Sequence, residues 1–521
     1  MLITGTDWAS CSNASNITIP ACNVIASKVN KTKDGYKTVQ EADENYTNVN
    51  YLDIDNLSVS TKAGWELDGG FIPELYDGIV STTDKTSIRL SSPTGLRFAH
   101  LVNVEKLDEL YAEVGNILRK VEFGTLIVPE DYLGEGVNPS VEALKAANKK
   151  YLEVKATYGK YYTVDQDAAT THFVGSIVNI LDSNITRDFV GIGYVKVITM
   201  SGLEYYYYSE TAMVDNVQGT AQRVIDTTGL SGYTVASQKA LQAYSEGKGL
   251  ADIIAADLNG LNVLAMGDSL FAGTDKGTAG CARENQWVNL LGRTNNWTLT
   301  NLGIGGMTVS QTSANVTTGK ASMYEWLFEG VNDYKWNSSS TGNNAYQGHG
   351  HNSYFQCGDF EGKTAEDVDL IILEGGCNDY GYAIAAPLGT ITSNDPSTFL
   401  GAWNCVVEEL LMIYPNAKIV FITTWYLNPQ SRPDGMSSIE YSTSINRLYD
   451  EVYADNDRVF IIDAGNPAVS GVDMRNIAWQ KEYSNDAYHL KDNGMALMAN
   501  AMLPRLWEIW VNATANEESA N

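Results

Sequence analysis

Residues 262–269 read NVLAMGDS, an apolar run of strand length that ends in Gly, Asp and Ser. Four later stretches are equally apolar, as expected of strands buried on both faces of a sheet: LTNLGIGG (299–306), VDLIILEGG (368–376), KIVFITTW (418–425) and RVFIIDA (458–464). Segments of helical spacing separate or follow them: QWVNLLGRT (286–294), FLGAWNCVVEELLMIY (399–414), SSIEYSTSINRLYDEVYA (437–454) and DNGMALMANAMLPRLWEIW (492–510). This alternation predicts a doubly wound α/β domain with a parallel five-stranded sheet at residues 261–512.

The part of the chain before residue 250 has a different rhythm. Apolar and polar residues alternate there in short runs bounded by Gly, Asp and Asn, which predicts strands: TSIRLSS (86–92), GLRFAHLVNV (95–104), FGTLIVP (123–129), YLEVKATYGKYYTV (151–164), HFVGSIVNIL (172–181), FVGIGYVKVITM (189–200) and LEYYYYSE (203–210). Helical spacing over 105–120 and 235–247 predicts two helices. We therefore expect a separate β-rich α+β module at 61–248, preceded at 1–60 by a lead-in segment that is either strand-rich or a partly ordered arm.

Composition narrows the classes of partner. The 521 residues include 35 Lys and Arg against 63 Asp and Glu, a formal net charge of −28, which would repel a phosphate backbone and so argues against nucleic acid binding. No apolar run is long enough to predict a membrane span. The opening residues lack the features of an export signal, which is absent or already removed, but the acidic, Tyr-, Trp- and Asn-rich composition favours an extracellular or cell-surface location. Cys11 and Cys22 have a spacing that suits a local disulfide.

Residues suited to acyl transfer follow the strands of the α/β domain. Ser269 ends the first strand, Gly306 ends a glycine-rich second stretch whose N–H groups can approach a ligand, and Asn378 offers a neutral amide after the third. Asp486 and His489 have a spacing that lets the carboxylate accept from one ring nitrogen while the other faces Ser269. Together these groups supply a nucleophile, an oriented base and donors for an oxyanion.

Each of these residues also has an ordinary structural explanation. Ser269 alone would be a turn serine, and His489 could cap the last helix. His349 and His351 form an H-x-H pair, but without further assignable ligands such a pair is more often part of a loop, so we expect no metal. Cys377 has no adjacent base and is expected to pack beside the site. The joint occurrence of the blocks favours catalysis.

Four blocks in this order resemble the SGNH, or GDSL-type, hydrolases: GDS (267–269), NLGIGG (301–306), GCND (376–379) and DAYH (486–489). The resemblance covers about residues 261–512 and implies a flavodoxin-like α/β fold and metal-free ester hydrolysis, with no cofactor. It also implies a role for each residue: Ser269 is the nucleophile, His489 the base and then the acid, and Asp486 orients His489. The oxyanion hole would consist of the Ser269 and Gly306 N–H groups and the Asn378 side chain.

An insertion at about 322–366 separates the second and third blocks and is long for a crossover between strands. It contains aromatic side chains that could stack on sugar faces or on an acyl chain, and Asn and Gln side chains that suit hydroxyl groups. The aromatic residues we select as candidate substrate contacts are Trp326, Trp336, Tyr346 and Tyr354. These residues favour a carbohydrate substrate.

The sequence therefore predicts an esterase that deacylates a carbohydrate, with O-acetyl groups of a polysaccharide or oligosaccharide as the favoured substrate. A lipase or thioesterase of the same fold is one alternative, and a binding or adhesion protein with a subsidiary hydrolase domain, such as a phage tail component, is another. Through FGTLIVPEDYL (123–133) and FVGIGYVKV (189–197), the amino-terminal half resembles an uncharacterised β-rich module of secreted Gram-positive bacterial proteins. That resemblance implies no activity, and attachment to a cell surface or polysaccharide is the role we expect of it.

Overall fold

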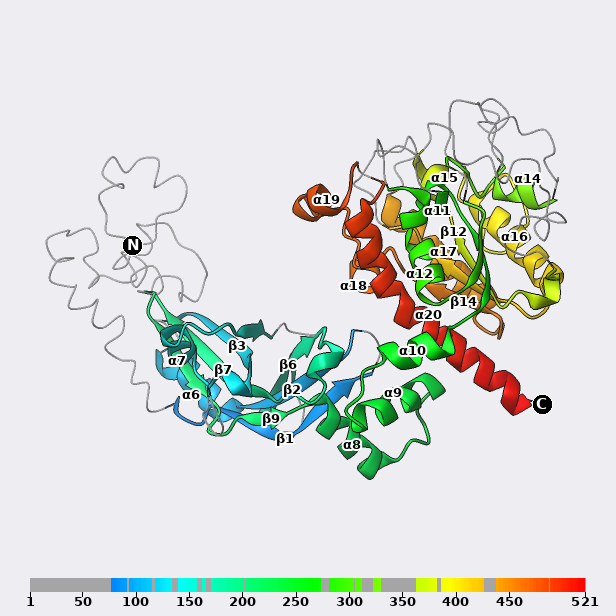
Figure 1. Ribbon diagram of the computed structural model, residues 1–521. Helices are drawn as coiled ribbons and strands as arrows, with labels where there is room; N and C mark the ends of the chain where they lie inside the picture. Colours follow the sequence, from blue (N-terminus) through cyan, green and yellow to red (C-terminus); the bar gives the residue numbers. More distant parts are fainter. Residues whose placement is uncertain are drawn as a thin grey trace, which may run out of the picture. The chain divides into compact units, whose positions relative to one another are not determined.

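The structure is a computed structural model of the whole chain (Figure 1). It describes residues 76–90, 93–114, 118–133, 139–156, 162–164, 170–200, 202–272, 281–303, 305–311, 322–328, 362–381, 386–425, 437–486 and 488–520. The predicted lead-in at 1–60 and the Cys11 and Cys22 pair lie outside the described residues.

The chain forms two compact units. The first comprises Met1–Ser231 and Leu241–Gly249, and the second comprises Gly232–Ala240 and Leu250–Asn521. The boundary between the units thus lies next to residue 250, except that residues 232–240, which include the first half of helix α9 (Val235–Ser245), are grouped with the second unit.

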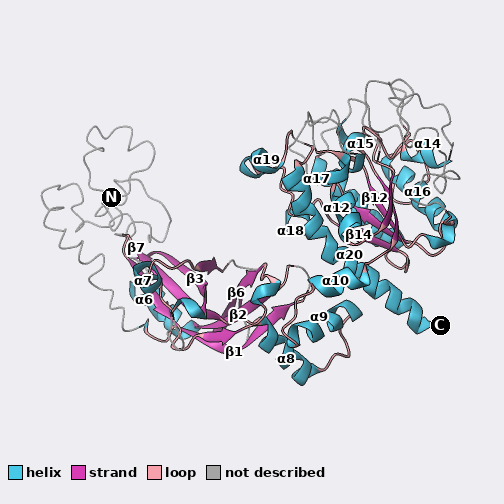
Figure 2. Cartoon of the chain, viewed as in Figure 1, coloured by secondary structure: helices cyan, strands magenta, loops and turns pink. Residues whose placement is uncertain are grey.

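Antiparallel strands form two sheets in the first unit, as the alternating sequence predicts (Figure 2). One sheet has the order β1-β2-β6-β5 and the other the order β4-β3-β7-β8, with β9 also pairing with β7. The strands are β1 Val80–Arg89, β2 Gly95–Asn103, β3 Leu118–Pro129, β4 Leu152–Lys155, β5 Tyr162–Val164, β6 Thr170–Val178, β7 Phe189–Thr199, β8 Glu204–Tyr208 and β9 Met213–Asp215. The helices are α6 Val104–Val114, α7 Val141–Ala146 and α8 Val217–Thr228, with short 3-10 turns at Glu130–Tyr132 and Asp182–Asn184.

Strand β7 is buried on both faces, which explains why its sequence is apolar except at Lys196 and Thr199. Val195 and Val197 belong to one core cluster, together with residues of β2, β6 and α6. The neighbouring positions Ile192 and Tyr194 point to the opposite face and belong to a second cluster, with residues of β3 and α7. The first unit therefore has a core on each side of its central strand.

The helix predicted over 105–120 is shorter in the structure. Helix α6 ends at Val114, and Leu118 already begins β3, where it pairs with Thr199 of β7. Leu118 has the spacing of the apolar helix face, but its side chain is buried in the core of the sheet instead. Strand pairing has thus overridden local helical periodicity, so the prediction was wrong at this end of the helix.

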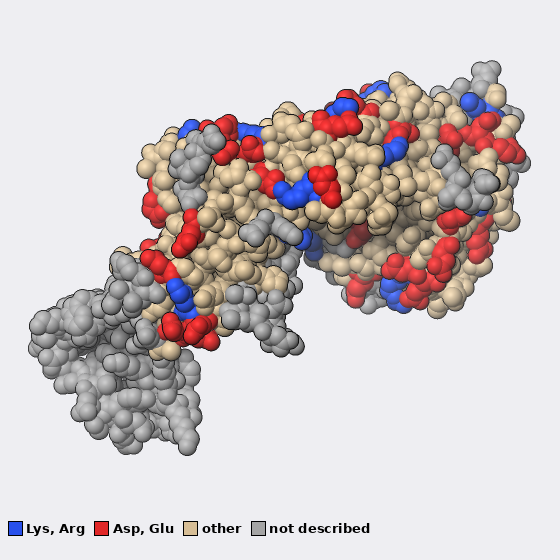
Figure 3. All heavy atoms as spheres, turned by 90° about the horizontal axis from the view of Figure 1, so that it is seen from below, with Lys and Arg blue, Asp and Glu red and all other residues tan. Residues whose placement is uncertain are grey.

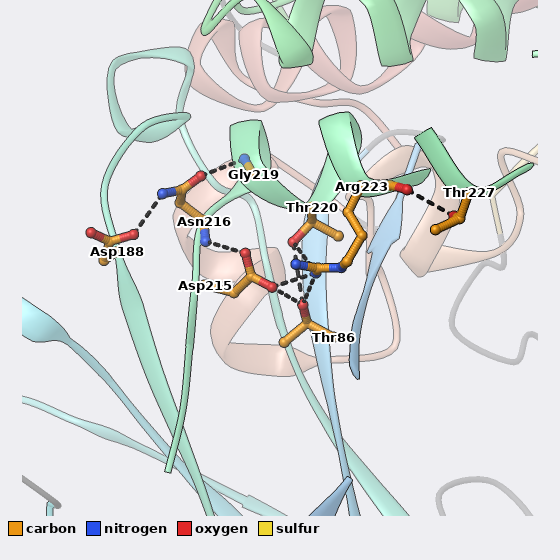
Figure 4. A network of polar contacts seen from close by, with 8 residues as sticks. All are labelled: Thr86, Asp188, Asp215, Asn216, Gly219, Thr220, Arg223 and Thr227. Carbon is orange, nitrogen blue, oxygen red and sulfur yellow. Dashed lines mark hydrogen bonds and ion pairs between the residues drawn. The ribbon is translucent and has the colours of Figure 1, made fainter. Parts of the chain in front are cut away.

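Helix α8 is tied to the sheet by a network of polar contacts (Figure 4). Asn216 is the N-cap of the helix, and its side chain accepts a hydrogen bond of 2.6 Å from the Gly219 N–H group. Two turns into the helix, Arg223 forms an ion pair with Asp215 at the end of β9 and donates to Thr86 of β1. The helix is therefore anchored to two strands of the first unit.

The second unit contains a five-stranded parallel sheet of order β11-β10-β12-β13-β14, which confirms the predicted doubly wound α/β fold. The strands are β10 Asn262–Met266, β11 Thr298–Asn301, β12 Leu370–Glu374, β13 Lys418–Ile422 and β14 Val459–Ile462. Four strands lie inside the apolar stretches that the sequence singles out, and β11 begins at Thr298, one residue before the stretch at 299–306. Strands β10, β12 and β13 consist mainly of buried residues, because helices cover both faces of the sheet.

Helices form two groups around this sheet (Figure 1). Helices α10, α12, α18 and α19 pack against α20, whereas α14 and α17 pack against α16. The bounds are α10 Ala251–Asp257, α11 Ser269–Ala272, α12 Trp287–Thr294, α14 Met323–Phe328, α15 Cys377–Gly381, α16 Phe399–Ile413, α17 Ser438–Leu448, α18 Pro467–Ser470, α19 Ile477–Tyr483 and α20 Asp492–Ala520. A π-helix, Tyr449–Tyr453, extends α17, 3-10 turns lie at Arg283–Asn285 and Ala365–Asp367, and α9 Val235–Ser245 is shared between the two units.

Asp and Glu side chains outnumber Lys and Arg side chains in the chain, and both lie on the surface of the described residues. On the face drawn in Figure 3, Lys and Arg side chains form small patches next to Asp and Glu rather than a continuous basic surface. Among the described helices, none combines the length and the apolar character that a membrane crossing requires.

Candidate active site

The carboxyl ends of β10 and β12 meet at the switch point of the parallel sheet. The chain continues from β10 to β11 on one side and from β12 to β13 on the other, so the connections after β10 and β12 run in opposite directions. Ligands bind at such a point in open α/β sheets. The register pairs Met266 with Leu373, and the residues after these two strands therefore leave the sheet next to each other. Helices α11 and α15, which begin just after the strands, lie at this edge (Figure 1).

Ser269, His489 and Asp486 are brought together at this edge from opposite ends of the domain. The Ser269 Oγ atom lies 2.9 Å from His489 Nε2, and His489 Nδ1 lies 2.8 Å from Asp486 Oδ2. The His489 side chain is 23% exposed and that of Asp486 is 38% exposed, so the contacts are partly shielded from water. A chain of hydroxyl, imidazole and carboxylate joined in this order has the geometry that can activate a serine.

The turn that carries His489 is fixed by hydrogen bonds within it. Asp486 Oδ1 accepts from the backbone N–H groups of Tyr488 and His489, at 2.7 and 2.6 Å. The His489 carbonyl accepts from the Ser484 hydroxyl at 2.7 Å, and Trp425, which follows β13, donates its Nε1–H to the Tyr488 carbonyl at 3.2 Å. One oxygen of Asp486 thus shapes the turn while the other orients the imidazole.

The charges at this turn support a base that takes up protons readily. Burial of His489 disfavours its charged form, but the hydrogen bond and charge of Asp486, together with the charge of Asp268, outweigh burial and raise the pKa of His489. Burial likewise acts to raise the pKa of Asp486, but hydrogen bonds from His489 and Tyr488 lower it overall. Asp486 therefore stays ionised beside an imidazole that accepts a proton more readily than a free histidine.

Two backbone N–H groups of the predicted oxyanion hole are not used by other parts of the described chain. The N–H groups of Ser269 and Gly306 donate no hydrogen bond to any described residue. Gly306 has a φ of +81°, a conformation that favours glycine. Gly303 in the same loop packs so closely on α11 that a Cβ there would lie 2.5 Å from the Ala272 nitrogen. The glycines therefore allow the loop after β11 to approach the Ser269 turn.

Asn378 differs from the free donor that the sequence predicts. Its Nδ2 group donates to Asp268 Oδ2 at 2.9 Å and to the Met307 carbonyl at 2.8 Å. Both amide hydrogens are thus already used within the protein, and an oxyanion could receive one of them only through a shared hydrogen bond. The side chain links the loop after β10 to the loop after β11.

Three buried carboxyl groups lie near the candidate catalytic residues: Asp379, Asp268 and Glu374. The sequence did not predict a role for Asp268 or Glu374. Asp379 accepts from the Val309 and Ser310 N–H groups at 2.8 and 3.0 Å and so fixes the loop after Gly306. Asp268 and Glu374 are 1% and 0% exposed, and their side chains contact each other. The sequence feature that could have indicated a special role for Glu374 is its position as the single acidic residue of the apolar strand LIILE.

The remaining candidates of the sequence analysis are less well placed or lie elsewhere. Trp326 belongs to α14, but its side chain is outside the described residues, as are Trp336, Tyr346, Tyr354 and the H-x-H pair. Burial raises the pKa of the Cys377 thiol well above its usual value, and the carboxylates around it act in the same direction, which makes it a poor nucleophile. No group of three or more His, Cys, Asp or Glu among the described residues could hold a metal ion.

Comparisons with solved structures return matches of low identity. A family two carbohydrate esterase from Cellvibrio japonicus is 13% identical, with 84% of this chain and 96% of that chain covered and a TM-score of 0.30. A carbohydrate esterase family 2 enzyme with a carbohydrate-binding domain from Corynascus is 10% identical, with 82% and 98% covered and a TM-score of 0.30. Phospholipase A1 from Streptomyces albidoflavus is 16% identical, with 47% and 98% covered and a TM-score of 0.27.

A family comparison assigns the second unit more directly. No curated protein matches the chain. The sequence model of one family, described as GDSL-like Lipase/Acylhydrolase, matches residues 263–502, a range that begins in β10 and ends in α20. It contains Ser269, Gly306, Asn378, Asp486 and His489. Residues 263–502 therefore form a domain of the GDSL-like lipase/acylhydrolase family, which makes the chain a carboxylic ester hydrolase.

Proposed function

We propose that this domain is a serine esterase that works through an acyl-enzyme, with Ser269 as nucleophile, His489 as general base and Asp486 as its orienting partner. The observation that carries the proposal is the pair of contacts that joins Ser269 Oγ to His489 Nε2 at 2.9 Å and His489 Nδ1 to Asp486 at 2.8 Å. A serine hydroxyl is a weak nucleophile until an oriented base removes its proton.

In the proposed reaction, Ser269 Oγ attacks the ester carbonyl carbon while His489 Nε2 takes the hydroxyl proton. The carbonyl oxygen becomes an oxyanion that the Ser269 and Gly306 N–H groups stabilise, and Asn378 shares one of its amide hydrogens with it. The ester bond then breaks, and His489 gives the proton to the departing alkoxide. Water, deprotonated by the same imidazole, then attacks the acyl-enzyme. The bond from Ser269 Oγ to the acyl carbon breaks, His489 returns its proton to Ser269 Oγ, and the carboxylic acid leaves and ionises in solution.

The pH dependence of this reaction follows from the state of His489. The imidazole must be neutral to accept the Ser269 proton, so kcat/KM should rise as the pH rises through the pKa of His489 in the free enzyme. Because Asp486 and Asp268 raise this pKa, we expect the midpoint of the acidic limb above the value of about 6.5 for an unperturbed histidine. Initial rates on a small aryl acetate across the pH range check this, and a midpoint at or below that value would contradict it.

For the substrate, we propose an acylated carbohydrate, with O-acetyl groups on a polysaccharide or oligosaccharide as the favoured case. The aromatic, Asn- and Gln-rich insertion at about 322–366 supports this proposal, because flat rings stack on sugar faces and amides bind hydroxyl groups. We also propose that the protein acts outside the cell or at its surface and that the first unit attaches it to a polysaccharide.

Release of acetate from a panel of acetylated oligosaccharides tests the substrate proposal. The matched comparison is a series of aryl esters with acyl chains of increasing length. A higher kcat/KM on acetylated sugars than on any aryl ester supports a carbohydrate esterase. A kcat/KM that grows with acyl length instead would identify a lipase or thioesterase and refute the carbohydrate assignment.

Trp336→Ala is expected to separate sugar recognition from catalysis. If the indole ring stacks on the sugar, its loss should raise KM for an acetylated oligosaccharide by about 3- to 10-fold, the equivalent of one aromatic contact. KM for phenyl acetate should not change, because that substrate lacks a sugar. An equal effect on both substrates would show that the residue acts on the fold or on the ester group.

A further inference from the structure

The carboxyl group of Glu374 is a buried group that the reaction above does not use. It ends β12 beside the Ser269 turn and is 0% exposed. Neither of its oxygens accepts a hydrogen bond of ordinary geometry from any described residue. The polar groups that contact it are the backbone N–H and the carboxyl group of Asp268.

Asp268 has the donors that Glu374 lacks. Asp268 Oδ1 accepts from the Leu270 N–H at 2.9 Å, and Oδ2 accepts from Asn378 Nδ2 at 2.9 Å. Hydrogen bonds from donors stabilise the charged form of a carboxyl group, and two contacting carboxyl groups in a buried site cannot both be ionised. The charge therefore belongs on Asp268 and the proton on Glu374.

The pKa values of the pair agree with this division. Burial, followed by the negative charge of Asp268, raises the pKa of Glu374 well above its usual value. Burial also raises the pKa of Asp268, but the Leu270 N–H group and the charge of His489 oppose it, and the result is about 6. At neutral pH, Glu374 is thus a hydrogen-bond donor and Asp268 is mainly an acceptor.

We propose that protonated Glu374 is a positioning residue of the active site, which donates a hydrogen bond to the Asp268 carboxylate and so holds in place the side chain that anchors both the Ser269 turn and the Asn378 amide. The anchor acts on two groups of the site. Through Leu270 it fixes the first turn of α11, and with it the direction of the Ser269 N–H; through Asn378 it fixes the loop that carries Gly306. This inference rests on the proposed function, since it concerns the same site.

Other titratable groups near the pair do not replace Glu374 as the donor to Asp268. The Asp379 carboxyl group already accepts from the Val309 and Ser310 N–H groups. Burial keeps the Cys377 thiol protonated, but an S–H group is only a weak donor. The charge of His489 lowers the pKa of Asp268, and the charge of Asp268 raises the pKa of His489. Asp486 is hydrogen-bonded to His489. On the neighbouring strand β13, the residue in register with Glu374 is the apolar Ile422. Any change in the charge of Asp268 should therefore be read in the titration of His489.

The test compares Glu374→Gln with Glu374→Leu in the full chain. The Gln amide can still donate to Asp268, whereas Leu has a similar size and no donor. With a small aryl acetate, we expect Glu374→Leu to lower kcat on the order of 10- to 100-fold with little change in KM, as for misplaced oxyanion donors. Glu374→Gln should rescue most of this loss.

The pH profile separates positioning from a packing effect. Without its donor in Glu374→Leu, Asp268 should bind a proton at higher pH, and its negative charge would no longer raise the pKa of His489. The acidic limb of kcat/KM should then move to lower pH in Glu374→Leu and stay in place in Glu374→Gln. Loss of activity in both variants without movement of the limb would overturn the proposal.

An infrared spectrum of the parent protein provides a readout that does not depend on activity or on the folding of the Leu variant. At neutral pH the parent should show the carbonyl stretch of a protonated carboxyl group that Glu374→Gln lacks. Glu366→Gln, a substitution of an exposed glutamate shortly before β12, is the matched control and should leave this band unchanged. Absence of the band would show that Glu374 is ionised and refute the inference. A parent that shows the band but hydrolyses no ester would refute the proposed function alone.

Discussion

Ser269→Ala should abolish nearly all ester hydrolysis, with kcat falling on the order of 10⁴- to 10⁶-fold, because nucleophile, base and orienting carboxylate act as one unit. The structural reason is that the Ser269 hydroxyl is the group that the His489 imidazole contacts on this edge of the sheet, at 2.9 Å. Release of acetate from a good substrate, measured over hours at high enzyme concentration, gives the range needed to quantify the loss.

Covalent trapping checks the same assignment without a substrate. After treatment with a fluorophosphonate that reacts with activated serines, the mass of the parent protein should increase by that of one bound label. The mass of Ser269→Ala should not change. Ser231→Ala, which removes an exposed serine of the first unit, is the matched control and should react like the parent. A kcat only about tenfold below the parent, or undiminished labelling of Ser269→Ala, would mean that another residue is the nucleophile.

The fold of the second unit could be predicted from sequence because most of its strands can be recognised from their own residues. Strands β10, β12 and β13 are largely apolar on both faces, so NVLAM (262–266) or KIVFI (418–422) is recognisable without knowledge of its neighbours. The end of α6 could not be predicted in this way, because Leu118 fits the helical spacing equally well. What decides its state is the pairing with Thr199 on β7, a long-range contact that local periodicity does not contain.

The site shows the same limit. The residues of the four blocks could be proposed because carboxyl ends of parallel strands share one edge of the sheet, and the structure does bring Ser269, Asp486 and His489 into contact there. The two acceptors of Asn378 were not predictable, since they depend on where the loops after β10 and β11 meet. The burial of Glu374 against Asp268 likewise arises only when β10 and β12 pair.

Asp486→Asn should lower kcat on the order of 10⁴-fold, although it changes one atom and preserves size, because it forces the wrong tautomer on His489. Asp486 Oδ1 accepts from the Tyr488 and His489 N–H groups, so the Asn side chain must keep its oxygen there. Its NH₂ group then faces His489 Nδ1, which has to act as an acceptor. The ring proton moves to Nε2, and Nε2 can no longer take the proton of Ser269.

Nitrogen NMR of the labelled imidazole distinguishes this mechanism from a simple loss of charge. In the parent protein at a pH above the His489 titration, Nδ1 should carry the proton, and in Asp486→Asn it should be Nε2. Asp486→Ala is the informative companion, because it removes the charge without imposing a tautomer, although it also removes the acceptor that shapes the turn. If the ring proton stayed on Nδ1 in Asp486→Asn while activity fell, the charge of Asp486 would contribute more to catalysis than its orienting hydrogen bond. The acidic limb of kcat/KM should then shift to lower pH, because that charge helps to raise the pKa of His489.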